Sequence, residues 1–217
     1  MSDIFNEVDE ELRREQFKKL WERYGLFVIA AAVLFVAAVG GWRGYEWWEA
    51  KRAAEAGVAF QAAIALNDEG KHEEAEAAFA KVAADSTANY RVFAKMREAA
   101  SLARRDPKAA IAIYQSLASD NKLDQMQRDL AAMRAAYLLV DTASYDELKK
   151  QLEPLTAPDR TFRHSARALL ALAAWRAGNA AEVRRWSDMI AADPESPSGT
   201  RNQIEMLLAL SAADGKS

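Results

Sequence analysis

The feature that most constrains this chain is a run of nineteen uncharged residues between Arg23 and Arg43, YGLFVIAAAVLFVAAVGGW. As a helix that rises about 1.5 Å per residue, this run would be roughly 28 Å long, which is enough to cross the hydrocarbon core of a bilayer. Tryptophan and tyrosine residues flank both ends, where their amphipathic rings favour the headgroup layer. We therefore predict a transmembrane helix over residues 24–42.

The run could also be a buried core helix or a cleaved signal peptide. A buried core helix is disfavoured because such helices usually carry a polar stripe, and residues 26–39 have none. A cleaved signal peptide would use the small residues Ala38 and Gly40 before a cut at Gly41. However, the first 23 residues contain seven acidic and five basic residues, unlike the short basic start of a signal peptide. An uncleaved signal anchor is preferred.

The distribution of basic residues predicts the orientation of this helix. Five Lys or Arg residues precede the run, and only Arg43, Lys51 and Arg52 follow it closely; the more basic side stays in the cytoplasm. We expect a cytoplasmic segment at residues 1–23 and a periplasmic domain at residues 43–217. The protein would then be a single-pass type II membrane protein, in contact with the lipid bilayer through residues 24–42; in a bacterium, the far side of this membrane is the periplasm.

Composition excludes several classes of function. The 29 basic and 32 acidic residues give a net charge of −3, without the basic excess typical of nucleic-acid binding. The chain has no cysteine, which excludes disulfides, thiolate zinc sites and cysteine nucleophiles and is compatible with an oxidising compartment.

Histidine is nearly as scarce, since the chain has only His72 and His164. His72 has Glu76 rather than a second histidine four residues on, so we interpret it as a turn residue at the start of a helix. His164, among arginines and serine, is expected to be a solvated helix residue. We predict no catalytic residue, no metal and no cofactor; a hydrolytic enzyme, the alternative, would have to depend on one of these histidines.

Four segments after the apolar run share one pattern. Each begins with a turn and places apolar residues at the start of a helix and then four and seven positions later, although the fourth has Ser187 in the middle. The first apolar positions are 35, 38 and 35 residues apart, close to the tetratricopeptide period. The segments are GKHEEAEAAFAKVAAD from Gly70, RDPKAAIAIYQSLASD from Arg105, ASYDELKKQLEPL from Ala143 and GNAAEVRRWSDMIAADP from Gly178.

A second helical stretch precedes each segment, at 53–67, 90–103, 127–140 and 162–177. Within a hairpin, we expect small residues such as Ala63 and Ala75 to face each other. Residues 198–213 fit a capping helix. The sequence predicts an all-α fold with one N-terminal transmembrane helix. A tetratricopeptide-repeat-like α-solenoid of about four helical hairpins and a C-terminal capping helix would follow. The alternative is an ordinary alanine-rich bundle of similar helix spacing.

In repeats of this kind the first helix of each pair lines a concave groove. That face would be mainly apolar here, and aromatic and methionine side chains suit contact with extended or helical peptides. The alternative is that these side chains pack between hairpins as core. The candidate groove residues are Phe60, Ile64, Lys95, Met133, Tyr137 and Trp175.

The order of these parts resembles the ancillary Sec translocon subunit family, the YfgM-like proteins of Gram-negative bacteria. The resemblance is carried by a single span ending in GWRGYEWW, the segment A-x-A-G-x-A-F-Q-A-A from Ala54, the repeat domain, and TRNQIEMLLALSA near the end. The N-terminal segment is longer than in the commoner form of the family.

This resemblance implies a protein-protein interaction module of the bacterial inner membrane, with periplasmic repeats and without catalytic residues. The implied partners are the SecYEG translocon, periplasmic chaperones that include a membrane-anchored prolyl-isomerase-like protein, and secreted or envelope polypeptides. The residues alone leave a second hypothesis open, in which the same repeats act as a scaffold or coordinator in cell-envelope assembly or cell division.

Overall fold

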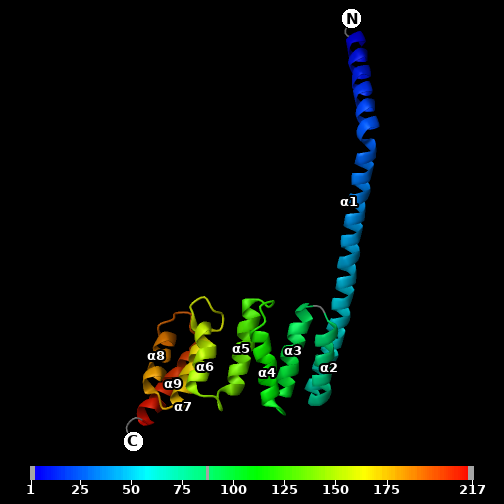
Figure 1. The fold of residues 1–217 in the computed structure, drawn as a ribbon. Helices are drawn as coiled ribbons and strands as arrows, with labels where there is room; N and C mark the ends of the chain where they lie inside the picture. The colour runs from blue at the N-terminus through cyan, green and yellow to red at the C-terminus, as the bar shows by residue number, and fades with distance from the viewer. Residues whose placement is uncertain (1–2, 87, 215–217) are drawn as a thin grey trace. The chain divides into compact units, whose positions relative to one another are not determined.

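The computed structural model describes the backbone of residues 3–86 and 88–214, and within these ranges it contains helices and no strands (Figure 1). The chain divides into two compact units, Met1–Ala54 and Glu55–Ser217. Helix α1 (Asp3–Asp68) has residues in both units. The predicted all-α class is confirmed.

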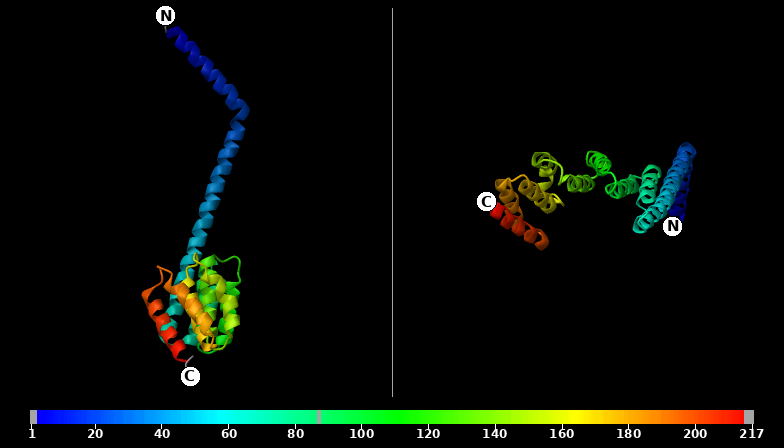
Figure 2. Two further views of the ribbon diagram at one scale, coloured as in Figure 1. Left: turned by 90° about the vertical axis from the view of Figure 1, so that its left-hand side faces the viewer. Right: turned by 90° about the horizontal axis from the view of Figure 1, so that it is seen from below.

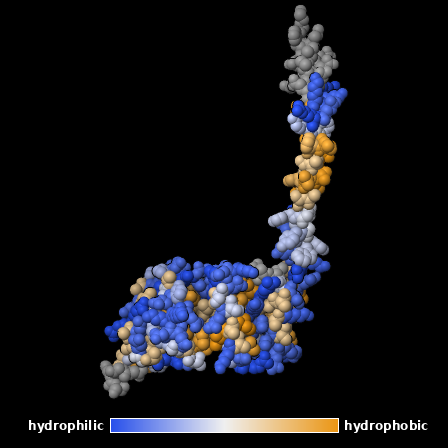
Figure 3. Space-filling view, viewed as in Figure 1, coloured by the Kyte–Doolittle hydropathy of each residue, from blue (hydrophilic) through white to orange (hydrophobic). Residues whose placement is uncertain are grey.

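The first unit is formed by α1, whose apolar segment carries exposed side chains. Among the residues described, α1 is the one helix long and apolar enough to cross a membrane, and only 6% of its most apolar window is buried. Figure 3 shows this segment as a hydrophobic band between hydrophilic ends. The segment is therefore not a core helix of this chain, and its length and composition suit either a membrane span or a signal sequence.

The second unit contains the end of α1 and a series of shorter helices that lie side by side in chain order (Figure 1, Figure 2). The predicted pairs are all present, and α9 packs against α7 and α8 with Ile204 and Leu207 buried, as expected for a capping helix. The elements are α2 (His72–Asp85), α3 (Ala88–Leu102), α4 (Pro107–Ala118), α5 (Gln125–Leu139), α6 (Tyr145–Leu152), a short 3₁₀ helix η1 (Glu153–Thr156), α7 (Arg163–Arg176), α8 (Ala180–Ala191) and α9 (Ser198–Asp214).

The turns between helices follow from local sequence. Gly70 and Gly178 end α1 and α7 with φ angles of 80° and 68°, a backbone region that glycine adopts without a steric penalty. In four of the helices a side-chain oxygen caps the N-terminus by accepting a hydrogen bond from a backbone N–H in the first turn. The capping residues are Asp106 for α4, Asp124 for α5, Ser144 for α6 and Asn179 for α8.

The predicted apolar register is confirmed in all four segments. Ser187, the one polar residue in the pattern, is 1% exposed and its hydroxyl donates to the Val183 carbonyl at 2.7 Å, which satisfies its hydrogen-bonding requirement inside the core. The buried positions are Ala75, Phe79 and Val82; Ala110, Tyr114 and Leu117; Leu148, Leu152 and Leu155; and Val183, Ser187 and Ile190.

Helix α5 is shared by two regions of the core. Its residues Ala131 and Ala135 pack with side chains of α3 and α4. On another face, Met133 and Ala136 belong to the largest cluster, which includes Leu148 of α6 and side chains of α7, α8 and α9. Because α5 contributes to both, it connects the N-terminal hairpins to the C-terminal ones.

A partly buried hydrogen-bond chain joins α6 to α8. The indole of Trp186, which is fully buried, donates to the Tyr145 hydroxyl at 2.8 Å, and that hydroxyl donates to the Glu182 carboxylate at 2.5 Å. Burial, followed by the hydrogen bond to Glu182, raises the pKa of Tyr145 to about 12. The phenol therefore remains a donor across the physiological range, and it fixes the spacing of the two helices.

Replacing Phe79 tests the repeat register. Its ring is 1% exposed and packs edge-on against Phe60 at 5.4 Å between centroids. We expect Phe79→Ala to lower the free energy of unfolding by about 3–5 kcal/mol, measured by urea unfolding of the full chain in detergent micelles. Phe93→Ala removes the same ring from a site 52% exposed and should change stability by about 0.5 kcal/mol or less. Equal effects of the two substitutions would contradict this assignment of the core.

Candidate functional site

The first helices of consecutive hairpins present equivalent residues on one face. Phe93, Arg97 and Ala100 of α3 have the same spacing as Leu130, Arg134 and Tyr137 of α5, 37 positions later, and as Ala168, Leu172 and Trp175 of α7, a further 38 positions on. Spacings of four and three place each set along one side of its helix. These three sets define the face on which a binding groove was expected.

A cavity of about 470 Å³ lies on this face. We call it the aromatic cavity, because three aromatic rings contribute to its wall and a fourth, Tyr114, comes from the neighbouring α4. Its lining residues are Phe60 of α1, Tyr90, Phe93, Met96, Arg97 and Ala100 of α3, Tyr114 of α4, and Leu130 and Arg134 of α5.

The rings are held by close packing. The Phe60 ring lies between Phe79 and Tyr90, at 5.4 and 6.2 Å between centroids. A Cβ atom at Gly57 would come within 3.0 Å of the Tyr90 hydroxyl oxygen, so the absence of a side chain at this position leaves room for Tyr90. This explains why a glycine is tolerated within α1 despite its low helix propensity.

Two guanidinium groups give the aromatic cavity a positive edge. The Tyr114 hydroxyl donates to the Met96 carbonyl at 3.2 Å. Burial raises the pKa of Tyr114, and the charges of Arg134 and Arg97 oppose that rise. Both arginines are exposed, and neither forms an ion pair with a residue that the structure describes. The cavity therefore offers aromatic surface next to positive charge that the domain does not neutralise.

Three of the six predicted groove residues lie on this face or beside the aromatic cavity. Phe60 lines the cavity, and Ile64 lines an adjoining smaller cavity that also includes Arg97 and Ala100. Tyr137 is 53% exposed, one helical turn beyond Arg134.

The other three predicted residues have different surroundings. Met133 is 2% exposed and lies in the core, so it offers no surface to a partner. Lys95 is half-buried, and its charge acts on Glu98. Trp175 lines a separate apolar cavity that α9 also lines with Ile204, Met206 and Leu207; the capping helix thus occupies part of this face at α7.

Of the nine residues that line the aromatic cavity, sequence reasoning predicted Phe60 and missed the other eight, among them Tyr90, Phe93, Arg97 and Arg134. A signal was present, because the two arginines stand at equivalent repeat positions 37 residues apart. Aligning the first helices with each other, rather than seeking apolar residues alone, would have identified them.

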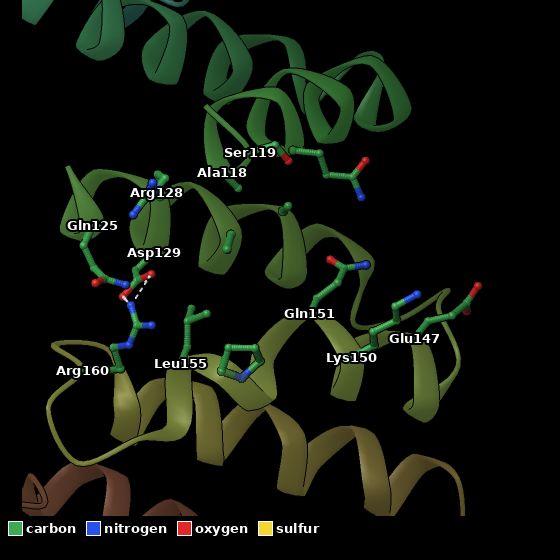
Figure 4. Close-up of a pocket in the computed structure, with 14 residues that line it drawn as sticks. Ala118, Ser119, Gln125, Arg128, Asp129, Glu147, Lys150, Gln151, Leu155 and Arg160 are labelled. Atoms are coloured by element: carbon green, nitrogen blue, oxygen red, sulfur yellow. Dashed lines mark hydrogen bonds and ion pairs between the residues drawn. The ribbon is translucent and has the colours of Figure 1, made fainter. Parts of the chain in front are cut away.

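A larger cavity of about 690 Å³ lies between α4, α5, α6 and η1 (Figure 4). We call it the polar cavity. Its floor includes Ala132 and Ala135 of α5, and at one end Arg160, from the loop before α7, bonds Asp129 of α5 at 3.1 Å. The remaining lining residues are Gln115, Ala118, Ser119, Gln125, Arg128, Glu147, Lys150, Gln151, Pro154 and Leu155.

The prediction that His164 is a solvated residue is wrong. Its side chain is 12% exposed, and its Nε2 lies 2.9 Å from Oδ2 of Asp193. The same oxygen accepts from Arg163 at 2.8 Å and from the buried Arg167 at 3.1 Å. The physical reason is that the loop after α8 folds back over the first turns of α7 and brings a carboxylate to three cationic or potentially cationic side chains.

This cluster has a structural role. Arg167 also donates to the Thr156 and Met189 carbonyls, so that its guanidinium joins η1, α8 and the following loop. The hydrogen bond from Arg163 is the main cause that holds the pKa of Asp193 well below its usual range.

The chain belongs to the tetratricopeptide repeat-like domain family. The sequence profile of that family, described as a tetratricopeptide repeat-like domain, matches residues 18–184, which include the apolar segment of α1 and the helices α2 to α7. Comparisons with curated proteins and with solved structures gave no match. All-helical folds of this family are typical of modules that bind other proteins.

The Asp193 cluster predicts acid sensitivity. Because the pKa of Asp193 is lower in the folded chain than the value of about 3.9 in unfolded chains, its contribution to stability is complete above about pH 5 and is lost as the pH falls below about 4. We expect the stability difference between the native chain and Asp193→Asn to be largest near neutral pH and to shrink in acid. Chemical unfolding at several pH values measures it. The exposed Asp159→Asn is the control and should show no such pH-dependent difference.

Proposed function

We propose that this protein is a membrane-anchored protein-protein interaction module at the periplasmic face of the bacterial inner membrane. In this proposal residues 1–23 are cytoplasmic, residues 24–42 cross the membrane as a signal anchor, and residues 43–217 form the periplasmic repeat domain. The module acts beside the Sec translocon and links it to periplasmic chaperones or to emerging polypeptides. No step of this function requires catalysis or a cofactor.

The observation that carries the proposal is the aromatic cavity on the face formed by first helices. Phe93 lies with Phe60 and Tyr90 in the wall of one cavity, and an exposed apolar surface to which several side chains contribute is typical of interaction sites. Aromatic side chains and arginine are also the residue types that dominate protein interfaces. A polypeptide can supply both apolar side chains for the rings and acceptors for Arg97 and Arg134.

A membrane anchor makes weak binding effective. A domain held at the membrane surface meets partners in the same membrane at a high effective concentration, so modest affinity at the cavity suffices. The repeat domain is almost neutral, with 24 basic and 25 acidic residues after position 42, and long-range attraction therefore contributes little. The preference for the Sec translocon as the neighbouring complex comes from the family resemblance.

The alternative is a scaffold or coordinator in cell-envelope assembly or cell division. The same cavity and anchor would serve that role, and the two proposals differ in the partner that occupies the cavity.

In-cell crosslinking tests the proposed partners. We expect a photo-reactive residue at Phe93 or Tyr137 to form adducts with Sec subunits, periplasmic chaperones or nascent envelope proteins, identified by mass spectrometry. Lys108, exposed on α4, is the matched control and should not give these adducts. Division or outer-membrane assembly proteins without Sec components would favour the alternative. Adducts only within the protein itself would contradict a partner site at this face.

Single-cysteine labelling tests the orientation. The chain has no cysteine of its own, so Ala212→Cys, at an exposed position of α9, introduces one thiol. It should react with a membrane-impermeant thiol reagent in cells whose outer membrane is permeabilised. Arg14→Cys, in the proposed cytoplasmic segment, should react only after the inner membrane is lysed. The reverse pattern would overturn the topology.

A further inference from the structure

The polar cavity and the aromatic cavity lie on opposite faces of the same helix. On α5, Arg128, Ala132 and Ala135 line the polar cavity, whereas Leu130 and Arg134 line the aromatic cavity. Positions two residues apart point about 200° from each other around an α-helix. A ligand in one cavity would therefore leave the other accessible.

The carboxylates that line the polar cavity are already engaged by the domain. Asp129 accepts hydrogen bonds from Arg160 at 3.1 and 3.3 Å. Glu147 accepts from the backbone N–H and the hydroxyl of Ser144 at 2.9 and 2.7 Å, and these bonds hold its pKa below the usual value. The oxygens of both carboxylates are thus hydrogen-bonded within the domain, and the charge of Asp129 is also neutralised by Arg160.

Two basic side chains of the same lining have no such partner in the part of the chain that the structure describes. Arg128 is half-buried and Lys150 is exposed, and neither forms a hydrogen bond or ion pair with a residue in the described ranges. Arg128 lies near the first turn of α5, where the helix dipole disfavours a positive charge. Figure 4 shows Arg128 and Lys150 toward opposite ends of the lining residues, with Leu155 between them in this view. With three basic and two acidic side chains in its lining, the cavity has an excess of positive charge that an anionic ligand would neutralise.

Part of the lining is apolar. The half-buried Ala118 and Ala132 contribute to it, whereas Ala135 and Leu155 are buried beneath the surface. A volume of about 690 Å³ is within the usual range for binding cavities, and a small inorganic anion would leave the alanine surface in contact with water. A segment of polypeptide that carries both carboxylates and an apolar side chain matches the charge and the apolar floor together.

We propose that the polar cavity is a second binding site, which takes an acidic segment of a partner protein. Its carboxylates pair with Arg128 and Lys150, and an apolar side chain covers the half-buried Ala118 and Ala132. With the aromatic cavity on the other face of α5, one repeat domain holds two polypeptides at once and connects them. We infer this site from the charge pattern of the polar cavity. The inference does not depend on the identity of the partner at the aromatic cavity.

Peptide selection on the full chain in detergent micelles tests this site. A displayed library of random peptides is selected on the native chain, and each selected peptide is measured on two double variants. The first variant, Arg128→Glu with Lys150→Glu, alters the polar cavity; the matched control, Arg97→Glu with Arg134→Glu, alters the aromatic cavity. Thermal melting monitored by circular dichroism checks that both variants fold.

We expect a class of selected peptides enriched in Asp and Glu. Their affinity should fall about tenfold or more on the first variant, because each charge-assisted hydrogen bond contributes more than about 1.4 kcal/mol, and should be unchanged on the control. Arg128→Lys, which keeps the charge, should retain part of the binding.

The proposal is overturned if every selected peptide binds the first variant as well as the native chain, or if the peptides that lose affinity lack acidic residues. It is also overturned if no peptide is selected, or if vesicles of anionic phospholipid bind through Arg128 and Lys150 while the peptides do not. If the affinity of the selected peptides falls only on the control variant, the aromatic cavity is supported as a binding site and this second site is refuted. The two proposals can therefore fail separately.

Discussion

The close contact of small side chains between neighbouring helices is the constraint on which the repeat domain depends. Alanine allows two helix backbones to approach closely. Most helices of the repeat domain contain one or more fully buried alanines. A larger side chain at such a position would force the helices apart and displace the cavities that they line. The alanines with 0% exposure are Ala63, Ala75, Ala94, Ala99, Ala110, Ala131, Ala136, Ala166, Ala171 and Ala174.

This packing makes α5 the central helix of the domain. It contributes alanines to the core on both sides, and only its remaining surface is available for binding. That surface carries Arg134 and Tyr137 on one side and Arg128 on the other. In a solenoid each hairpin contacts mainly its neighbours, so a helix of this kind can position two cavities without a further structural element. The proposed partner site lies on one of these faces, and the proposed site for an acidic segment lies on the other.

The predicted groove residues show how much of the binding face can be predicted from the sequence. Phe60 and Tyr137 were predicted because aromatic residues on first helices stand out in the sequence. Met133 was chosen by the same reasoning, yet its side chain points into the largest core cluster. Periodicity specifies which residues share a helix face, but several hairpins compete for the apolar ones, and only the packing decides which are covered. His164 was misinterpreted for a related reason, since its partner Asp193 is 29 residues away in the chain.

The sequence by itself determined the apolar segment, the helix pairs and their buried register, because these depend on local properties: hydrophobic run length, capping residues, and apolar spacing along a helix. The tertiary structure decided how the surface is used. The two cavities, the unneutralised charges of Arg97, Arg134, Arg128 and Lys150, and the Asp193 cluster arise where helices distant in sequence meet. Such contacts depend on the angle and separation at which helices pack, which short sequence patterns do not specify.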